Sequence, residues 1–282
     1  MPDASEPLLR IGKIPYANLF PIFYMLEKEC DCSQYEFVEG VPSRLNRLLR
    51  DGAIDISPSS SIEYLRYQDR YSLIDDHSIS SKGPVGSILL FSRKPIERMK
   101  GLTIFTLSQS ETSVVLLDII LKKFYGIESI LRPTDKPIDL LTGDAQAYLS
   151  IGDDALKTKK SLNSESKISN PIYIYDLGEL WYRNTGLPFV FALWIVRKSC
   201  YSEKAKLLEK FISDLDKAKI LAMKNLDQCA KEIIPLFFSQ HSLFLTEDEL
   251  IAFWKGISYD FGAEHQMGLN LFRRYSEELG LL

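Results

Sequence analysis

The chain opens with an alternation of short apolar strands and amphipathic helices, and this pattern constrains its fold more than any other feature. The predicted order is strand 8–11, helix 18–29, strand 35–38, a helix from Ser43 to a stop at Gly52, strand 53–57 and a helix opened by residues 58–61. Ser43 is a suitable N-cap, and Gly52 suits the C-terminal stop of its helix. This βαβαβ order implies a parallel sheet with helices packed over it.

The same alternation begins again at Gly101, which indicates a second α/β unit. Here the predicted order is strand 102–105, a helix capped at 110–113 that runs over 114–124, and strand 148–151. Residues 157–171 are rich in Ser, Lys and Asn and are expected to form a solvated loop. After Ser202 the chain is predicted to be almost wholly helical.

Two apolar strands, at 87–92 and 189–196, can join these units. We expect crossings near 91–95 and 192–197. Residues 1–94 and 196–282 would then form one lobe, and residues 95–195 an inserted second lobe. A ligand cleft is expected between the two lobes, at the carboxyl ends of the strands, with closure about the two hinge strands.

Charge and composition narrow the classes of function. With 34 Lys+Arg against 38 Asp+Glu the net charge is −4, and the basic residues are scattered, so no nucleic-acid partner is expected. No apolar run of about 18 residues could span a bilayer, and residues 1–10 have no secretory character, so no membrane partner is expected. Four cysteines without a CxxC pair argue against a metal site and favour reduced thiols in a cytoplasmic protein. Nothing in the pattern indicates an oligomeric state.

Three segments place polar side chains at the start of a predicted helix, directly after a strand: residues 16–18, 57–61 and 108–113. Helix N-termini carry unpaired N–H groups and a partial positive charge, so they bind carboxylates and phosphates. Ordinary N-capping explains any one of these segments more simply. Their convergence on one cleft favours an anionic small molecule.

The polar run from Asp76 to Ser87 leads into the first hinge strand and places Ser87 at the cleft. A surface loop explains residues 78–81 well, but Ser87 less well, because it begins an apolar strand. No catalytic triad order, GxSxG, Walker, GxGxxG or HExxH motif occurs. His77 has no motif partner, and Asp153 with Asp154 fits helix-start solvation better than an acid–base pair. The aromatic stretch 181–189 fits packing better than ligand cover.

Taken in order, several segments resemble the chorismate dehydratases of menaquinone biosynthesis. The matching segments are residues 10–21, residues 52–58 with Ser60, Ser61, Glu63 and Tyr64, and residues 78–87, 90–92, 151–156, 175–179 and 185–192. The resemblance covers about residues 8 to 200, and the helical C-terminal third matches only in character. Residues 17–20 and 107–113 depart from the family pattern without removing a functional side chain. With the two predicted lobes, we expect an α/β, bilobal, periplasmic-binding-protein-like fold of type II.

The resemblance implies a lyase without a cofactor, which converts chorismate to 3-[(1-carboxyvinyl)oxy]benzoate and water in the futalosine route. This small-molecule substrate is a dianion, in agreement with the anion sites predicted above. Asn18 is implied to orient the substrate and to hydrogen-bond developing charge, and Ser87 to hold a carboxylate or relay a proton. These two are the expected catalytic residues. The expected substrate-binding residues are Ser60, Gly86, Ser110, Thr112, Ser113, Gly152 and Asp153.

The matching segments contain no convincing histidine or carboxylate base. We therefore expect the enolpyruvyl carboxylate of the substrate to take the ring proton while the cleft fixes its pose. Two alternatives stay open. A 1,4-dihydroxy-6-naphthoate synthase of the same pathway would use a cleft histidine, and none lies between His77 and His241. A non-enzymatic solute-binding or sensor protein would carry an export signal or DNA-binding helices, and the sequence indicates neither.

Overall fold

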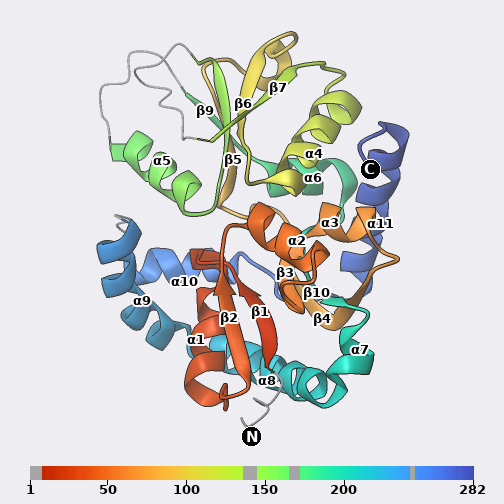
Figure 1. Ribbon diagram of the computed structural model, residues 1–282. Coiled ribbons are helices and arrows are strands. Elements are labelled where there is room, and N and C mark those ends of the chain that lie inside the picture. The colour runs from red at the N-terminus through yellow and green to blue at the C-terminus, as the bar shows by residue number, and fades with distance from the viewer. Residues whose placement is uncertain (1–7, 136–144, 165–171, 242–244) are drawn as a thin grey trace, which may run out of the picture.

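The chain folds into two α/β lobes, each built around a five-stranded sheet (Figure 1). This computed structural model describes residues 8–135, 145–164, 172–241 and 245–282. In the described part of the chain, no helix is long and apolar enough to cross a membrane.

The first sheet has the spatial order β2-β1-β3-β10-β4. Its strands are β1 (Leu9–Lys13), β2 (Tyr35–Glu39), β3 (Ile56–Ser60), β4 (Tyr71–Ser81) and β10 (Phe189–Arg197). β1 pairs in parallel with β2 and β3, whereas β10 runs antiparallel to β3 and β4. The prediction of a parallel sheet therefore holds for three strands, and the strand that returns from the other lobe is antiparallel.

The second sheet repeats this plan in the order β7-β6-β8-β5-β9. Its strands are β5 (Ile88–Ser92), β6 (Thr103–Leu107), β7 (Ile130–Thr134), β8 (Ala147–Ile151) and β9 (Tyr173–Asp176). β6 pairs in parallel with β7 and β8, and β5 runs antiparallel to β8 and β9. In each sheet, the antiparallel fourth strand is the one by which the chain arrives from the other lobe.

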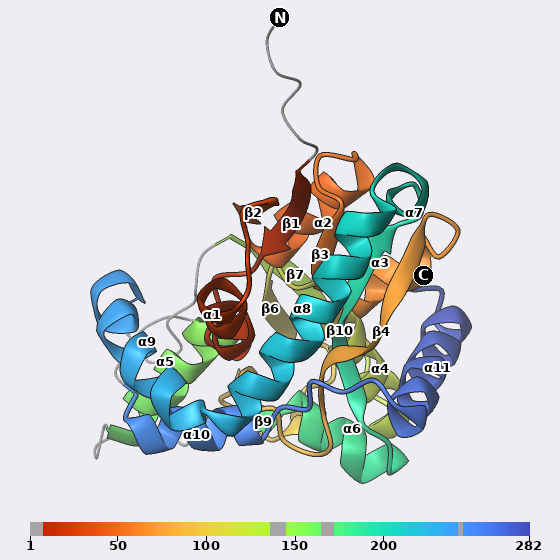
Figure 2. The same cartoon turned by 90° about the horizontal axis from the view of Figure 1, so that it is seen from below.

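Helices cover these sheets, and the C-terminal helices close the first lobe (Figure 2). In the first half of the chain they are η1 (Ala17–Leu19), α1 (Phe20–Glu29), α2 (Pro42–Arg50), α3 (Ser61–Arg66), η2 (Ile96–Arg98), α4 (Glu111–Ile119) and the π-helical turn η3 (Ile120–Phe124). In the second half they are α5 (Gly152–Ser164), α6 (Leu177–Thr185), α7 (Cys200–Glu203), α8 (Ala205–Lys224), α9 (Leu226–His241), α10 (Glu247–Lys255) and α11 (Ala263–Glu278).

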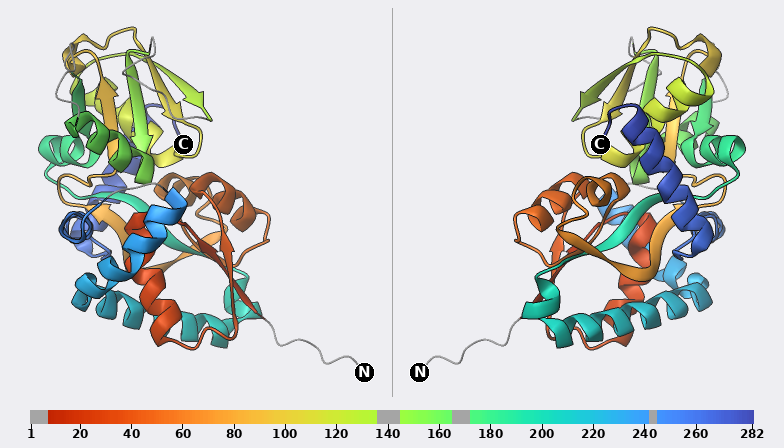
Figure 3. Two further views of the ribbon diagram at one scale, coloured as in Figure 1. Left: turned by 90° about the vertical axis from the view of Figure 1, so that its left-hand side faces the viewer. Right: turned by 90° about the vertical axis from the view of Figure 1, so that its right-hand side faces the viewer.

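Helix α11 packs along both lobes (Figure 3). A Cβ atom at Gly268 would lie 2.0 Å from the carbonyl oxygen of Pro188, so this helix lies directly on the segment that returns to β10. Farther along, the Tyr275 ring meets the Phe124 ring of the second lobe at 6.1 Å between centroids. The close approach at Gly268 requires a residue without a side chain.

Sheet membership bears on the lobe boundaries. The expected boundary at 94/95 would place β5 in the first lobe, and the boundary at 195/196 would place most of β10 in the second. In the structure, β5 instead belongs to the second sheet and β10 to the first. We propose that the chain crosses between lobes at residues 82–87 and again at 186–188, between α6 and β10.

Four local predictions differ from the structure. Residues 78–81 are not a surface loop but the buried end of β4, because the segment at Ser258 pairs with Ser80. Residues 157–164 are helical rather than a loop, and residues 165–171 lie outside the described part. The third strand continues through Pro58 to Ser60, because β10 pairs with all of it. Helix α2 begins at Pro42, before the expected N-cap Ser43.

A buried carboxylate ties three parts of the first lobe together. Asp55, which is 1% exposed, accepts hydrogen bonds from the Arg10 backbone N–H at 2.8 Å and from Lys204 Nζ at 2.6 Å. Arg10 Nη2 adds a third contact at 3.3 Å. Burial alone raises the pKa of Asp55, but the hydrogen bonds from Lys204 and Arg10 outweigh it and hold the pKa below its ordinary value. The stabilisation is therefore present above that ordinary value and is lost as the pH falls from there through the lower pKa of the folded state.

Asp55→Asn is expected to lower the free energy of unfolding by about 3 kcal/mol at pH 7, because it leaves two cations without their buried partner. Urea unfolding measures this loss. The control is Glu277→Gln, which breaks a half-exposed pair with Arg273 and is expected to change the value by less than about 0.5 kcal/mol. Equal losses in the two variants would show that the buried pairing does not stabilise the lobe.

Candidate active site

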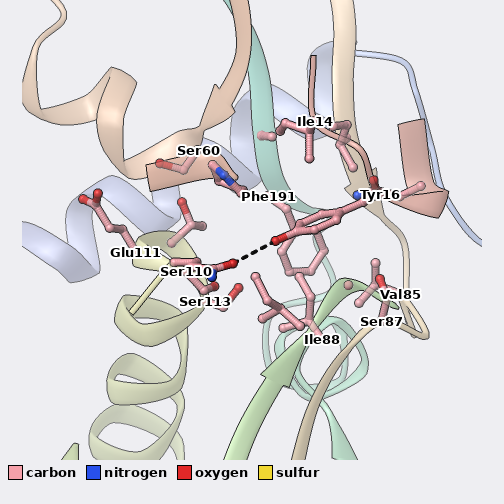
Figure 4. A pocket seen from close by; sticks show the side chains of 18 residues that line it. Ile14, Tyr16, Ser60, Val85, Ser87, Ile88, Ser110, Glu111, Ser113 and Phe191 are labelled. Atoms are coloured by element: carbon pink, nitrogen blue, oxygen red, sulfur yellow. Dashed lines mark hydrogen bonds between the residues drawn. The ribbon is translucent and has the colours of Figure 1, made fainter. Parts of the chain in front are cut away.

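A cavity lies between the two sheets and is lined by residues from both lobes (Figure 4). It holds about 640 Å³ of empty space, open mouth included. The lining residues are Ile14, Tyr16, Asn18, Pro42, Ser60, Ile79, Val85, Ser87, Ile88, Gln109, Ser110, Glu111, Thr112, Ser113, Ile151, Gly152, Phe191 and Ala192. The wall thus combines aliphatic and aromatic side chains with a ring of hydroxyl and amide groups.

Ser87 reaches this cavity because a single carboxylate fixes the crossing segment before it. Asp176 Oδ1 accepts from the Val85 N–H at 3.0 Å, and Asp176 Oδ2 accepts from the Gly86 N–H at 2.6 Å. Gly86 has φ +78°, a conformation that glycine adopts without strain. The Ser87 carbonyl in turn accepts from the Gly152 N–H at 2.7 Å. The Ser87 side chain is therefore held at the start of β5.

Asn18 is placed by the C-terminal part of the chain. Its carbonyl oxygen accepts from Tyr259 Oη at 2.5 Å, and the neighbouring Ala17 carbonyl accepts from Trp254 Nε1 at 2.8 Å. The side-chain Oδ1 of Asn18 is buried and has no hydrogen-bond partner among the described residues. A buried amide oxygen without a partner is costly to the folded state, and a ligand donor would remove that cost.

The serines at the helix starts do not cap their own helices. Neither Ser60 at the start of α3 nor Ser110 at the start of α4 makes a side-chain capping bond, so ordinary N-capping is wrong for both. Ser60 Oγ instead accepts from Asn46 Nδ2 at 2.9 Å. The N-terminus of α4 therefore opens toward the cavity with the first-turn N–H groups that every helix leaves unpaired.

The second lobe caps two helices of the first lobe. Thr112 Oγ1, on α4, accepts from the Ile62 N–H in the first turn of α3 at 3.1 Å. Asp153 Oδ1, at the start of α5, accepts from the Ala17 N–H of η1 at 3.1 Å. Each of these groups satisfies a donor that the helix of the opposite lobe cannot satisfy itself. These bonds tie the two lobes together beside the cavity.

Tyr16 crosses the cavity from the first lobe. Figure 4 shows its ring directed toward the segment around Ser110, and its hydroxyl donates to Gln109 Oε1 at 3.3 Å. Burial, with the nearby charges of Asp153 and Asp154, raises the pKa of Tyr16, so the phenol stays protonated at neutral pH.

Seven of the nine expected site residues line this cavity, and two lie next to it. Asn18, Ser60, Ser87, Ser110, Thr112, Ser113 and Gly152 belong to the lining. Gly86 turns its N–H toward Asp176, and Asp153 turns Oδ1 toward Ala17, so neither is among the lining residues. Tyr16, Gln109 and Glu111 lie within the segments 16–18 and 108–113 that were expected at the cleft, but they were not among the expected site residues. Tyr16 could have been found from its place two residues before Asn18 in the strand–helix connection.

The charged groups near the cavity are largely compensated. Glu111 in the lining pairs with Arg66 Nη1 at 2.9 Å, which also links α4 to α3 across the lobes. Asp153 is 6% exposed; burial raises its pKa to about 6, although the Ala17 N–H and Lys157 oppose this shift. Its Oδ2 atom is buried and has no partner among the described residues. In the described part of the chain, no three His, Cys, Asp or Glu side chains cluster as metal ligands.

Comparison with known proteins gives relatives along most of the chain. The model of a family described as menaquinone biosynthesis matches residues 9–278. A chorismate dehydratase of Thermus thermophilus is 32% identical over 203 residues, which are 69% of this chain and 72% of the relative. A chorismate dehydratase of Campylobacter jejuni is 32% identical over 213 residues, 74% of each chain.

Solved structures show the fold. A protein of Archaeoglobus fulgidus is similar with a TM-score of 0.78 and 18% identity, covering 99% of this chain and all of that one. The periplasmic aliphatic sulphonate-binding protein of Escherichia coli is similar with a TM-score of 0.66 and 14% identity, covering 99% and 89%. The expected bilobal, periplasmic-binding-protein-like fold is therefore confirmed.

Gly152→Ala is expected to destabilise the protein more than Gly126→Ala. Both glycines have positive φ, +58° and +64°, so each alanine carries about 1 kcal/mol of backbone strain. Only at Gly152 would the new Cβ meet a neighbour, the Tyr16 ring at 3.3 Å, whereas nothing lies within 4 Å at Gly126. Urea unfolding should therefore give a larger loss for Gly152→Ala, by about 1 kcal/mol. Equal losses would contradict the contact.

Asp153→Asn is expected to stabilise the protein above pH 6. Burial of the charged carboxylate raises the pKa of Asp153 to about 6 in the folded state. Protonation of Asp153 therefore favours the folded state, and this contribution to stability is present below the ordinary pKa and is lost as the pH rises through about 6. An asparagine Oδ1 can still accept from the Ala17 N–H. The gain should approach about 3 kcal/mol at pH 7.5 and vanish near pH 4, as measured by urea unfolding at both values.

The control for this variant is Asp154→Asn. The Asp154 side chain is 45% exposed, and its contact with Lys157 is long, at 4.0 Å. It should change stability by less than about 0.5 kcal/mol at either pH. A loss of stability in Asp153→Asn at pH 7.5 would contradict the unfavourable burial of its charge.

Proposed function

The chain belongs to the menaquinone biosynthesis family, and on that basis we propose that it is a chorismate dehydratase. The reaction is an elimination. The C–H bond at the ether-bearing ring carbon breaks, its electron pair forms a new ring double bond, and the C–O bond to the neighbouring hydroxyl breaks. The proton and the hydroxyl make up one water molecule. The ring becomes aromatic, which drives the step, and the product is 3-[(1-carboxyvinyl)oxy]benzoate.

The observation that carries this proposal is the composition of one cavity. Asn18 and Ser87, which the family resemblance implies to be catalytic, line it together with the hydroxyl groups around the start of α4. This places a neutral amide and several hydroxyl donors around the same space. Such groups suit a substrate that is bound through its carboxylates and hydroxyl.

The charge of the substrate fits the start of α4. The first-turn N–H groups of that helix and the hydroxyls of Ser110 and Ser113 face the cavity and can receive a carboxylate. Glu111 lies in the same wall, but its ion pair with Arg66 reduces its repulsion of an anion. The N–H dipoles and hydroxyls thus supply the local positive field that the net charge of −4 does not.

We assign the removal of the ring proton to the carboxylate of the substrate itself. Among the described lining residues, the titratable side chains are Tyr16, a phenol whose pKa is raised, and Glu111, which is held by Arg66. An enolpyruvyl carboxylate held next to the ring C–H can take the proton intramolecularly, where effective concentrations are high. The protein then contributes by holding the substrate in the orientation that this transfer needs.

We assign two roles to the catalytic pair. The Asn18 side chain orients the substrate and hydrogen-bonds the charge that develops on it or the leaving hydroxyl. Its Oδ1, which has no partner among the described residues, would accept a hydrogen bond from a substrate hydroxyl. Ser87, directly before β5, holds a carboxylate or relays a proton. We further place this activity in the cytoplasm, which the free thiols of Cys30, Cys32, Cys200 and Cys229 support.

Asn18→Ala and Ser87→Ala are each expected to lower turnover of chorismate by at least about a hundredfold, because each removes a hydrogen bond that fixes or stabilises the reacting groups. The measurement is the absorbance of the aromatic product formed by purified protein, after urea unfolding has shown that each variant is folded.

Asn225→Ala and Ser202→Ala serve as matched controls, because both residues lie on or beside the C-terminal helices and outside the cavity lining. They should retain wild-type turnover. Near wild-type rates in Asn18→Ala and Ser87→Ala would refute the assignment of these two residues. Binding of chorismate by the wild-type protein without conversion would refute the dehydratase and favour a solute-binding or sensor protein.

A further inference from the structure

A second cavity lies at the end of the first sheet that points away from the second lobe. β3 and β10 run from one site to the other: Ser60 pairs with Ala192 at the first cavity, and Ile56 pairs with Val196 at the opposite end. In Figure 1 that end lies beside α7 and the start of β4. The lining residues are Leu49, Arg50, Arg70, Tyr71, Arg197, Lys198 and Ser199, around about 460 Å³ of empty space with the open mouth included.

Positive charge dominates this second cavity. Four of its seven lining residues are cationic, and no carboxylate lines it in the part of the chain that the structure describes. Three of the four are arginines, whose planar guanidinium groups can donate two parallel hydrogen bonds to one anion. The cations come from three separate segments, the end of α2, the turn before β4 and the end of β10.

The carboxylates behind the cavity already have partners. Glu63 accepts from Arg50 Nη1 at 2.8 Å and from Tyr71 Oη at 2.9 Å. Asp55 is held by Arg10 and Lys204 and lies 3.8 Å from Arg197 Nη1. The side chains of Arg70 and Lys198 form no ion pair within the described ranges. The cavity therefore keeps a surplus of positive charge on a protein whose net charge is −4.

Besides the ion pair of Arg50 with Glu63, the cations are held in place by contacts that carry no negative charge. The guanidinium carbons of Arg50 and Arg70 lie 5.3 and 5.6 Å from the centre of the Tyr67 ring. Arg197 Nη1 donates to the Gly52 carbonyl at 3.3 Å. The Lys198 N–H donates to the Arg70 carbonyl at 3.0 Å and keeps those two backbones adjacent. Like charges around one cavity repel one another, and a bound anion would relieve that repulsion.

Ser199 provides an independent indication of a ligand. It lines the same cavity, and its Oγ is buried without a hydrogen-bond partner among the residues described. Buried hydroxyl groups in native proteins almost always have a partner. A rotation of this side chain toward the cavity would let an oxygen of a bound ligand accept from the hydroxyl and supply the missing partner.

We propose that this cavity binds a phosphate-bearing ligand. A planar carboxylate offers two oxygens in one plane, whereas a phosphate offers several oxygens in a tetrahedral arrangement, which suits donors that converge from three segments. Three guanidinium groups, one ammonium group and one hydroxyl then donate hydrogen bonds to the oxygens of one phosphate dianion or one diphosphate. The proposal depends on these residues alone, and its test measures binding, so its outcome is separate from that of the dehydratase.

The probe is pyrophosphate, titrated calorimetrically into the full chain at fixed ionic strength with sodium chloride as the balancing salt. Saturable binding is expected. Arg70→Gln and Lys198→Gln should each weaken the Kd by about tenfold, the loss expected for a charge-assisted hydrogen bond. Ser199→Ala should weaken the Kd severalfold without changing the charge. Both cations are exposed, so these variants are expected to fold, and urea unfolding checks this.

The matched controls are Arg98→Gln and Lys206→Gln, which remove an exposed arginine and an exposed lysine outside the cavity. Neither should change the Kd. Equal weakening of pyrophosphate binding by control and cavity variants would overturn the proposal, because general electrostatic attraction would then explain the binding.

A phosphate can belong to a free metabolite or to a lipid headgroup, and sedimentation with vesicles separates the two. Vesicles of phosphatidylglycerol in phosphatidylcholine are compared with vesicles of phosphatidylcholine alone. Pyrophosphate binding without sedimentation assigns a free ligand. Sedimentation with the anionic vesicles that Arg70→Gln and Lys198→Gln abolish assigns a headgroup. If pyrophosphate fails to bind and sedimentation is absent or unaffected by these variants, no phosphate site exists here.

Discussion

The arrangement of the cleft depends on the carboxylate of Asp176. Its two oxygens accept from four backbone N–H groups, two in the first turn of α6 and two in the segment that crosses between the lobes. Burial raises the pKa of this carboxyl, and the four N–H donors oppose that shift by replacing water around the charge. The same contact also requires close packing, since a Cβ at Gly178 would lie 2.6 Å from the Gly83 carbonyl. One side chain thus begins a helix, shapes the crossing and places Ser87.

The second lobe completes two helix starts of the first lobe. Thr112 satisfies an N–H group of α3, and Asp153 satisfies one of η1, each from across the cleft. A helix start that is capped from the other lobe has its donor satisfied only while the lobes are together. Ser60 and Ser110 meanwhile make no capping bond to their own helices, which leaves the cavity wall with hydroxyls for a ligand. Contact between the lobes and the proposed anion recognition therefore use the same chemistry at neighbouring residues.

The sequence was sufficient for the alternation of strands and helices, the two lobes and most of the cavity wall, because apolar periodicity and helix-start residues are local signals. It was insufficient where a distant segment decides the outcome. The serines of β4 are polar and suggested a loop, yet Ser80 exchanges two backbone hydrogen bonds with Ser258, and Ser78 donates to the Asp260 carbonyl. Those partners lie about 180 residues away, beyond any local pattern. Likewise, the residue type at a helix start does not reveal whether its hydroxyl caps that helix or faces a cleft.

The net charge, like the local sequence pattern, does not show which distant residues come together in the fold. The scattered Lys and Arg residues argued against a surface for nucleic acid, and that argument concerns a long, continuous stripe of positive charge. It does not apply to a single phosphate, which needs only a few cations at one point. Arg50, Arg70 and Arg197 belong to different segments of the sequence. The end of α2, the turn before β4 and the end of β10 nevertheless meet at one end of the first sheet. The cleft, for which we propose binding through N–H dipoles and hydroxyls, and the second cavity, which gathers cations, thus offer an anion two different kinds of site on a protein of net charge −4.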